Sequence, residues 1–202
     1  MALSKIQSES VNLSDNFAFS GTVTGAGEAA GLKLLSTTTV TDATGSISFD
    51  NLSTTYDTFY VDYSLHPATD NVYPRVRFLN SSGTAVTSSD YGQTAVLMDN
   101  VNIVSSNTAA EIRIVHSTCG NAALEGVSGY FYFRNRNYDN SVSDQFVSNI
   151  IGASNSVNNG GGENHNWYAG FLGNNTEVRG FQITFSSGNI DEGYARLYGV
   201  VK

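Results

Sequence analysis

The sequence has a single cysteine, two prolines and few charged residues. Because Cys119 is alone, the chain can form neither an internal disulfide nor a cysteine-based metal site. Charged residues make up 14% of the 202 positions, well below the ~25% of ordinary soluble domains. Ser, Thr, Asn and 20 Gly supply the polarity instead. This composition favours short strands joined by turns and disfavours helices.

Clusters of positive charge and long apolar runs are lacking too. The three Lys and seven Arg are scattered singly, and the net charge is −8. Since nucleic-acid binding depends on clustered cations, we expect no nucleic-acid partner. No run approaches the ~20 apolar residues that cross a bilayer, and the first ten residues lack the apolar stretch of a signal peptide. We therefore expect that the chain does not insert into a membrane. We also expect that it is synthesised in the cytoplasm of a cell.

The beginning of the chain differs from the rest. Residues 1–31 are predicted to be an N-terminal attachment arm and connector, and residues 32–202 a single β domain. Small residues dominate positions 25–31, as is typical of a flexible connector. An extra strand of the main sheet is the alternative role for the apolar part of the arm. The residues expected to dock on a partner surface are Leu3, Ile6, Val11, Leu13, Phe17 and Phe19.

Alternation of apolar and polar residues with a period of two identifies the strands. It is clearest over residues 55–65, where one face is expected to join the core: Phe59, Val61, Tyr63 and Leu65. Further strands are predicted over residues 32–41, 46–50, 94–98, 110–116, 127–134, 145–151 and 166–172. The glycine-rich residues 158–162 are predicted to form a loop.

Residues 72–80 are predicted to form a strand with a cationic outer face. Val76 and Phe78 alternate there with Arg75 and Arg77. Pro74 cannot donate a backbone hydrogen bond, which places it at the beginning of this strand or on a sheet edge.

The closing segment, residues 181–201, is predicted to be two strands joined by a polar turn, a pair that closes a sheet. In all, about ten closely spaced strands without a convincing helix predict an all-β fold. The predicted architecture is an antiparallel two-sheet sandwich of jelly-roll type with an extended N-terminal arm.

Several segments of the sequence resemble those of a family of tail-fibre-like or capsid-fibre-like proteins of marine bacteriophages. They are Leu34-Leu-Ser-Thr-Thr-Thr-Val40 with Ile47-Ser-Phe49, Tyr56-Asp-Thr-Phe-Tyr-Val61 with His66-Pro-Ala-Thr-Asp70, and the segment from Ser187 to Val200. The opening residues 3–7 and 19–25 are similar to N-terminal attachment regions of marine phage structural proteins.

The resemblance implies a virion structural protein: a fibre, knob or decoration subunit displayed on the virion surface. It implies a homo-oligomer, a trimer by analogy, that is anchored to capsid or tail proteins through the arm. It implies no identified ligand, and residues 81–175 match the family poorly.

Residues with catalytic or metal-binding potential do not form a recognisable motif. Cys119 lies three positions from His116, but at a strand end this spacing points the two side chains apart. Glu163 and His165 share a side of an extended chain and make at most half a metal site beside a glycine-rich turn. Calcium held by loop oxygens stays open, although no twelve-residue calcium loop is present. We predict no enzyme activity, no catalytic residues and no cofactor.

The alternative function is a carbohydrate-binding module that recognises a host surface. Aromatic side chains beside amides are common at sugar-binding surfaces, and one stretch combines them: Asn164, His165, Asn166, Trp167 and Tyr168. Tyr73, Tyr91 and Tyr138 are weaker candidates in polar loops. A tryptophan in a strand is also a frequent core residue, because it buries a large area. Both roles of Trp167 are therefore open at this point.

Overall fold

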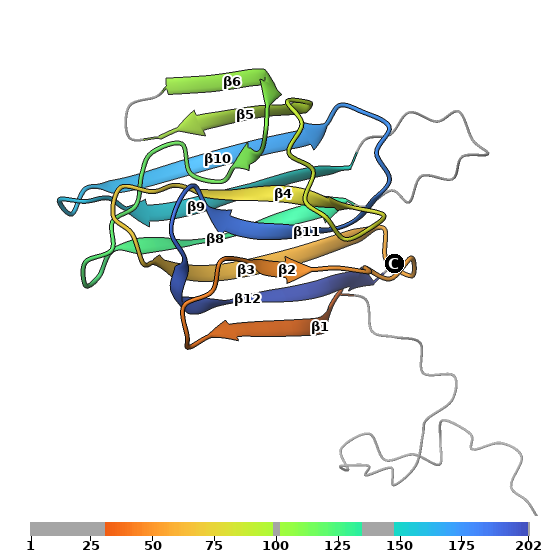
Figure 1. Cartoon of the computed structure of the whole chain (residues 1–202), viewed down its shortest axis with the longest axis horizontal. Helices are drawn as coiled ribbons and strands as arrows, with labels where there is room; N and C mark the ends of the chain where they lie inside the picture. The colour runs from red at the N-terminus through yellow and green to blue at the C-terminus, as the bar shows by residue number, and fades with distance from the viewer. Residues whose placement is uncertain (1–30, 99–101, 135–147, 202) are drawn as a thin grey trace, which may run out of the picture.

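A computed structural model describes residues 31–98, 102–134 and 148–201. Every regular element in these ranges is a β-strand, and the strands form two antiparallel sheets (Figure 1). The predicted all-β sandwich is therefore confirmed. The arm residues Leu3, Ile6, Val11, Leu13, Phe17 and Phe19 lie outside the described residues. Gly31, which was assigned to the connector, is the first residue of strand β1.

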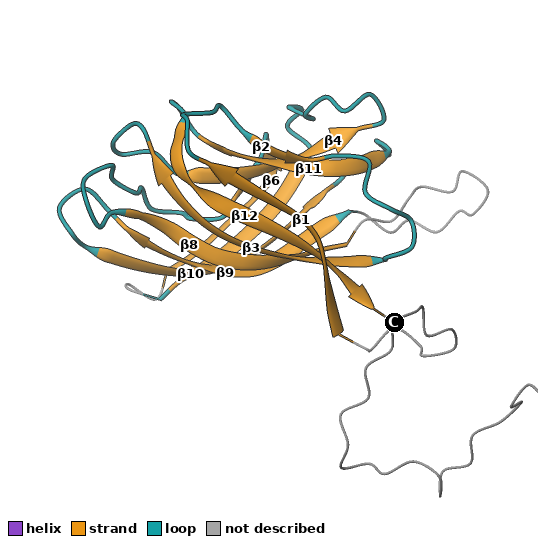
Figure 2. Ribbon diagram, turned by 90° about the horizontal axis from the view of Figure 1, so that it is seen from below, coloured by secondary structure: helices purple, strands orange, loops and turns teal. Residues whose placement is uncertain are grey.

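The large sheet has eight strands and the small sheet has four. In spatial order the large sheet consists of β1 (Gly31–Val40), β12 (Ile190–Val201), β3 (Thr58–Pro67), β8 (Gly126–Arg134), β9 (Asn149–Val157), β10 (Glu163–Leu172), β5 (Tyr91–Leu97) and β6 (Asn102–Ala109). The small sheet consists of β2 (Ile47–Phe49), β11 (Val178–Phe185), β4 (Pro74–Asn80) and β7 (Ile112–Arg113). Figure 2 shows the large sheet curving beneath the small one, with its other face left open by the described strands.

The core lies between the two sheets and is rich in aromatic rings. The inward face predicted for β3 is confirmed, since Phe59, Val61, Tyr63 and Leu65 are all buried. Phe181 of the small sheet packs between two rings of β8, with centroid distances of 5.3 Å to Phe131 and 5.0 Å to Phe133. Close contact of this kind, at tilted and edge-on angles, is the preferred packing of aromatic rings. It joins the two layers at the centre of the sandwich.

The closing strands do not pair with each other, so the prediction of a strand pair that closes one sheet is wrong. β11 pairs with β2 and β4 in the small sheet, whereas β12 pairs with β1 and β3 in the large sheet. Residues 186–189 therefore carry the chain from one layer to the other. Both strands bury one face in the same core from opposite sides, as Phe181 and Leu197 do. The alternation of apolar and polar residues is the same whether two strands form a hairpin or lie in facing sheets. It therefore does not predict which strands pair.

Other strand predictions need smaller corrections. The strand predicted over residues 110–116 contains only β7, and the polar β6 before it was missed. The strand predicted over residues 145–151 continues to Val157. Pro74 is the first residue of β4, as predicted. The predicted glycine-rich loop separates β9 from β10.

Eight strands are shared between the layers, and the chain changes layer at each step from one of them to the next except from β4 to β7, which both lie in the small sheet. Their order is β1-β12-β3-β8 in the large sheet and β2-β11-β4-β7 in the small sheet. The remaining strands, β9, β10, β5 and β6, extend the large sheet beyond β8. This extension enlarges the open outer face, where the candidate site lies.

Candidate functional site

The outer face of the large sheet carries a row of apolar side chains that crosses five strands. The strand register places Tyr130 of β8 opposite Ala153, Ala153 opposite Trp167, Trp167 opposite Val96, and Val96 opposite Ile103 of β6. Trp167 is 60% exposed and Ile103 is 68% exposed. Of the two roles open for Trp167, the structure therefore gives it the exposed one. Contiguous exposed apolar side chains are common at interaction surfaces, which makes this row the candidate site.

Tyr130 and Trp167 form the two sides of a hollow of about 490 Å³, which we call the aromatic groove. Ala153 lies between them in the register, so the backbones of the two residues lie two strand spacings apart, roughly 10 Å. The methyl group of Ala153 leaves the space between the rings open. Along one side run polar groups that the register also aligns: Ser128, Asn155 and His165.

The five residues predicted as glycan contacts are divided between the two faces of β10. His165 and Trp167 point outward, whereas Asn164, Asn166 and Tyr168 are buried, with exposed fractions of 4%, 1% and 3%. The contiguous set is therefore corrected, because successive side chains of a strand point to opposite faces. Glu163 lies on the outer face as expected, with a carboxylate oxygen 3.7 Å from Nε2 of His165.

Sequence reasoning missed the partners of Trp167 on neighbouring strands. Tyr130 belongs to β8, which is remote from Trp167 along the chain, and Asn155 belongs to β9, the strand directly before β10. Alternation predicted which side chains share a face of one strand, but the register between strands comes only from the fold.

The three tyrosines that were weaker candidates for sugar contact lie in different surroundings. Tyr91 is fully buried, Tyr73 is half-buried, and Tyr138 lies outside the described residues.

A tyrosine cluster on the same face supports the groove from the side. The ring of Tyr60 lies 5.3 Å from that of Tyr132, 5.9 Å from that of Tyr130 and 5.8 Å from that of Tyr198. Burial, and secondarily the carboxylate of Asp62, raises the pKa of Tyr60 above its usual value. The Tyr60 hydroxyl therefore stays protonated at physiological pH. Mutual packing restricts the rotamers of these rings and holds Tyr130 in place.

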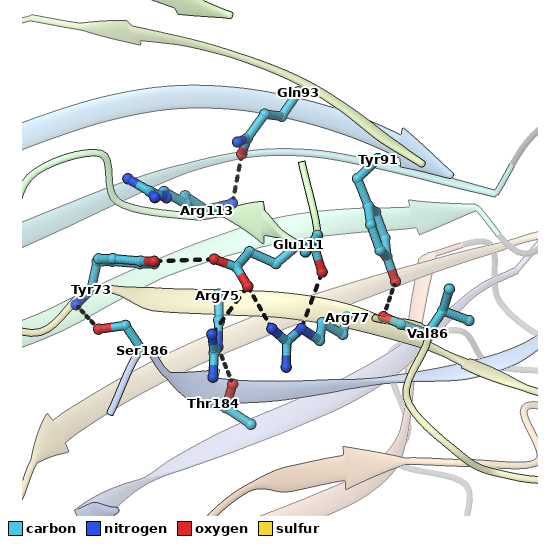
Figure 3. A network of polar contacts seen from close by, with 11 residues as sticks. Tyr73, Arg75, Arg77, Val86, Tyr91, Gln93, Glu111, Arg113, Thr184 and Ser186 are labelled. Atoms are coloured by element: carbon cyan, nitrogen blue, oxygen red, sulfur yellow. Dashed lines mark hydrogen bonds and ion pairs between the residues drawn. The ribbon is translucent and has the colours of Figure 1, made fainter. Parts of the chain in front are cut away.

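A network of polar contacts centred on Glu111 lies beside the small sheet (Figure 3). Glu111, 8% exposed, accepts hydrogen bonds from Arg75 at 3.0 Å, Arg77 at 2.7 Å and the Tyr73 hydroxyl at 3.1 Å. Arg75 also donates to the hydroxyl of Thr184 on β11. The predicted cationic face of β4 is therefore paired with a carboxylate.

The electrostatics of Glu111 suit a structural role. Burial alone would raise the pKa of Glu111, but Arg75, Tyr73 and Arg77 together outweigh it and lower that pKa below its usual value. The carboxylate is held as an anion with both oxygens engaged. A general acid needs a proton to give at the working pH, which this environment disfavours.

Cys119 and His116 lie in surroundings that disfavour their charged forms. The Cys119 thiol is buried and donates to the carbonyl of Val72 at 3.1 Å. Burial raises its pKa to about 12, so the reactive thiolate is disfavoured. Burial, and secondarily Arg113, lowers the pKa of His116 to about 4. Among the described residues no group of three or more His, Cys, Asp or Glu is placed to hold a metal ion.

No protein-family model, curated protein or solved structure matches this chain. Within the described ranges no helix has the length and apolarity to span a membrane.

Proposed function

We propose that the chain is a carbohydrate-binding β-sandwich that presents the aromatic groove to a glycan. The observation that carries the proposal is the pairing of exposed Trp167 with Tyr130 across Ala153 on an open sheet face. Such an exposed tryptophan side chain contributes little to the stability of the fold, because most of its apolar area stays in water. Its area becomes useful when a ligand covers it.

The chemistry of the groove matches that of a sugar. A pyranose ring presents C–H groups on its faces and hydroxyls on its edge. Trp167 and Tyr130 offer apolar surface to the ring faces. Ser128, Asn155 and His165 line one side of the same groove and offer both donors and acceptors to hydroxyls. A purely apolar partner would leave these polar groups unpaired.

A glycan array probed with the full chain tests this proposal. Trp167→Ala is expected to weaken binding by about tenfold or more, since loss of a central aromatic anchor costs roughly 2 kcal/mol. Phe171→Ala is the matched control, because Phe171 lies on the same face of β10, is 40% exposed and does not line the groove. Absence of glycan binding, or an equal effect of both substitutions, would contradict a carbohydrate site at the groove.

The strand order supports a jelly roll as the type of sandwich. Among the eight strands shared between the layers, counted in chain order, the first, eighth, third and sixth lie in the large sheet, and the second, seventh, fourth and fifth lie in the small one. This is the order of two Greek keys folded into facing sheets. Jelly rolls occur in both viral capsid and lectin domains, so the fold suits a virion protein that binds sugars.

The second proposed function is a virion structural subunit, the role that the phage resemblance implies. Edge strand β1 favours it, because Leu32, Leu34 and Leu35 are 51%, 55% and 38% exposed there. Exposed leucines on an edge strand are suited to contact with a neighbouring subunit. In this proposal the chain is a homotrimer on the virion surface, and the arm binds capsid or tail proteins.

Light scattering on the full chain and on the double variant Leu32→Ser, Leu34→Ser tests the role of β1. A trimer that dissociates in the variant supports a β1 interface, and an unchanged trimer excludes it. Deletion of residues 1–24 tests the arm. The shortened chain is expected to fold but no longer to bind to virus particles. If the remaining residues do not fold, the hypothesis of a separate attachment arm is refuted.

A further inference from the structure

A second hollow opens on the same face of the large sheet, with a volume of about 530 Å³. We call it the acidic hollow; it is lined by Ser64, His66, Glu125 and Glu192 as well as by Ser128 and Asn155. The last two residues also line the aromatic groove. The register places Ser64 opposite Ser128 and Ser128 opposite Asn155. The two hollows therefore meet at Ser128 and Asn155 and form one trough across β12, β3, β8, β9 and β10.

Charge is distributed unevenly along this trough. The described residues that line the two hollows include Glu125 and Glu192 but no Arg or Lys. Glu125 accepts backbone hydrogen bonds from Ala122 at 2.8 Å and from Gly160 at 3.3 Å, which fix its carboxylate at the rim. Asp191 lines neither hollow, but its carboxylate lies 3.9 Å from Nδ1 of His66, which lines the acidic hollow. One end of the trough is thus aromatic, and the other is acidic.

We propose that the trough is a single site for an extended oligosaccharide without acidic groups. This inference rests on the proposed carbohydrate-binding function and specifies its ligand. One sugar unit would pack in the aromatic groove, and the chain would continue past Ser128 and Asn155 into the acidic hollow. Ionised carboxylates only accept hydrogen bonds, so Glu125 and Glu192 select ligand groups that donate, such as hydroxyls or amines.

The same carboxylates exclude anionic sugars. A uronate, sialate or sulfate placed in the acidic hollow would face like charges, and no lining Arg or Lys would compensate them. The net charge of −8 adds a repulsive field of the same sign. Specificity therefore comes from repulsion at one end of the trough and aromatic packing at the other.

Titration calorimetry on the full chain tests the proposal with two probe sets. The first is a length series of neutral oligosaccharides of glucose, mannose and N-acetylglucosamine, and the second is a set of oligogalacturonides of equal lengths. Affinity for a neutral series is expected to rise several-fold as the chain grows long enough to reach the acidic hollow. Oligogalacturonides are expected to bind more weakly than neutral chains of equal length.

Glu192→Lys removes the repulsion at an exposed position and is expected to raise affinity for oligogalacturonides several-fold. Glu177→Gln is the charge control, because Glu177 is exposed and lines neither hollow. Affinity independent of chain length, together with no effect of Glu192→Lys, would overturn the extended site. If Trp167→Ala still weakens binding in that case, the proposed function stands. If no probe binds, the proposed function falls with the inference.

Discussion

The hydroxyl of Tyr168 donates a hydrogen bond to the backbone carbonyl of Tyr130 at 3.0 Å. Tyr168 is buried on the inner face of β10, directly after exposed Trp167. Its hydroxyl also lies 3.2 Å from that of Tyr63, another buried residue. The two sides of the aromatic groove are therefore connected from behind. Trp167 is fixed by its own strand, and Tyr130 by a bond from the next residue of that strand.

Tyr168→Phe is expected to destabilise the fold by about 1–3 kcal/mol, because Tyr63 loses one of its two buried hydroxyl partners, Ser154 being the other, and the Tyr130 carbonyl loses a donor. Denaturant unfolding measures this loss. Glycan affinity is expected to fall less than in Trp167→Ala, since the substitution changes the support of the groove and leaves its surface intact. Tyr132→Phe is the control, because this ring is 40% exposed on the outer face. Equal stability of the two variants would show that the buried bond contributes nothing.

Gly152 permits the close approach of β9 to β8 beneath the groove. A Cβ at this position would lie 2.1 Å from the backbone oxygen of Tyr130 and 2.7 Å from Cβ of Phe131. Gly152→Ala is therefore expected to cost about 1–3 kcal/mol of unfolding free energy, as overpacked cores do. At Gly45 the nearest atom would lie 3.9 Å away, so Gly45→Ala is the matched control. Melting temperatures of both variants test this difference, and a Gly152→Ala protein as stable as the control would contradict it.

His116 is expected to make the fold sensitive to mild acid. Its pKa is lowered from 6.5 to about 4 in the folded state, by burial first and by Arg113 second. Between pH 6.5 and 4 the unfolded chain binds a proton that the folded chain does not, so stability falls as the pH falls through this window. The loss of melting temperature from pH 7 to pH 5 is expected to shrink in His116→Gln. An identical loss in both proteins would show that His116 does not cause it.

The sequence predicted which face of a strand is buried more reliably than which strands pair with each other. Alternation placed Phe59 and Leu65 in the core correctly, because that pattern depends on one strand alone. It did not show that β11 and β12 lie in different sheets, since either arrangement buries the same residues. β6 was missed because its polar positions follow no clear alternation, and its faces are mostly exposed at the sheet edge.

The candidate site was predictable only in part for the same reason. The sequence identifies Trp167 because it is an aromatic residue next to amide side chains. Its exposed side chain then makes it the centre of the groove. Asn164, Asn166 and Tyr168 were grouped with it by sequence, but a strand turns them to the core. Tyr130 and Asn155 join it through the register of β8 with β9 and of β9 with β10, which the pattern of one strand does not give.

The Glu111 network is expected to stabilise the small sheet and to define a second acid-sensitive step. Glu111→Ala would leave Arg75 and Arg77, both less than one-fifth exposed, without their carboxylate. Removing one partner of such a buried pair costs about 3–5 kcal/mol, and solvent contact of the arginines places the expected loss at the lower end. Denaturant unfolding at pH 7 measures it, with Glu177→Gln as the exposed control.

The pH dependence separates this step from that of His116. The pKa of Glu111 is lowered below its ordinary 4.5 in the folded state, so its contribution is fully present above pH 4.5 and is lost as the pH falls through the folded value. Wild type is therefore expected to lose stability below pH 4.5 more steeply than Glu111→Ala. The two unfolding free energies should converge as the acid titration proceeds. Parallel curves over this range would mean that the two arginines are stabilised by other contacts and that the carboxylate is dispensable.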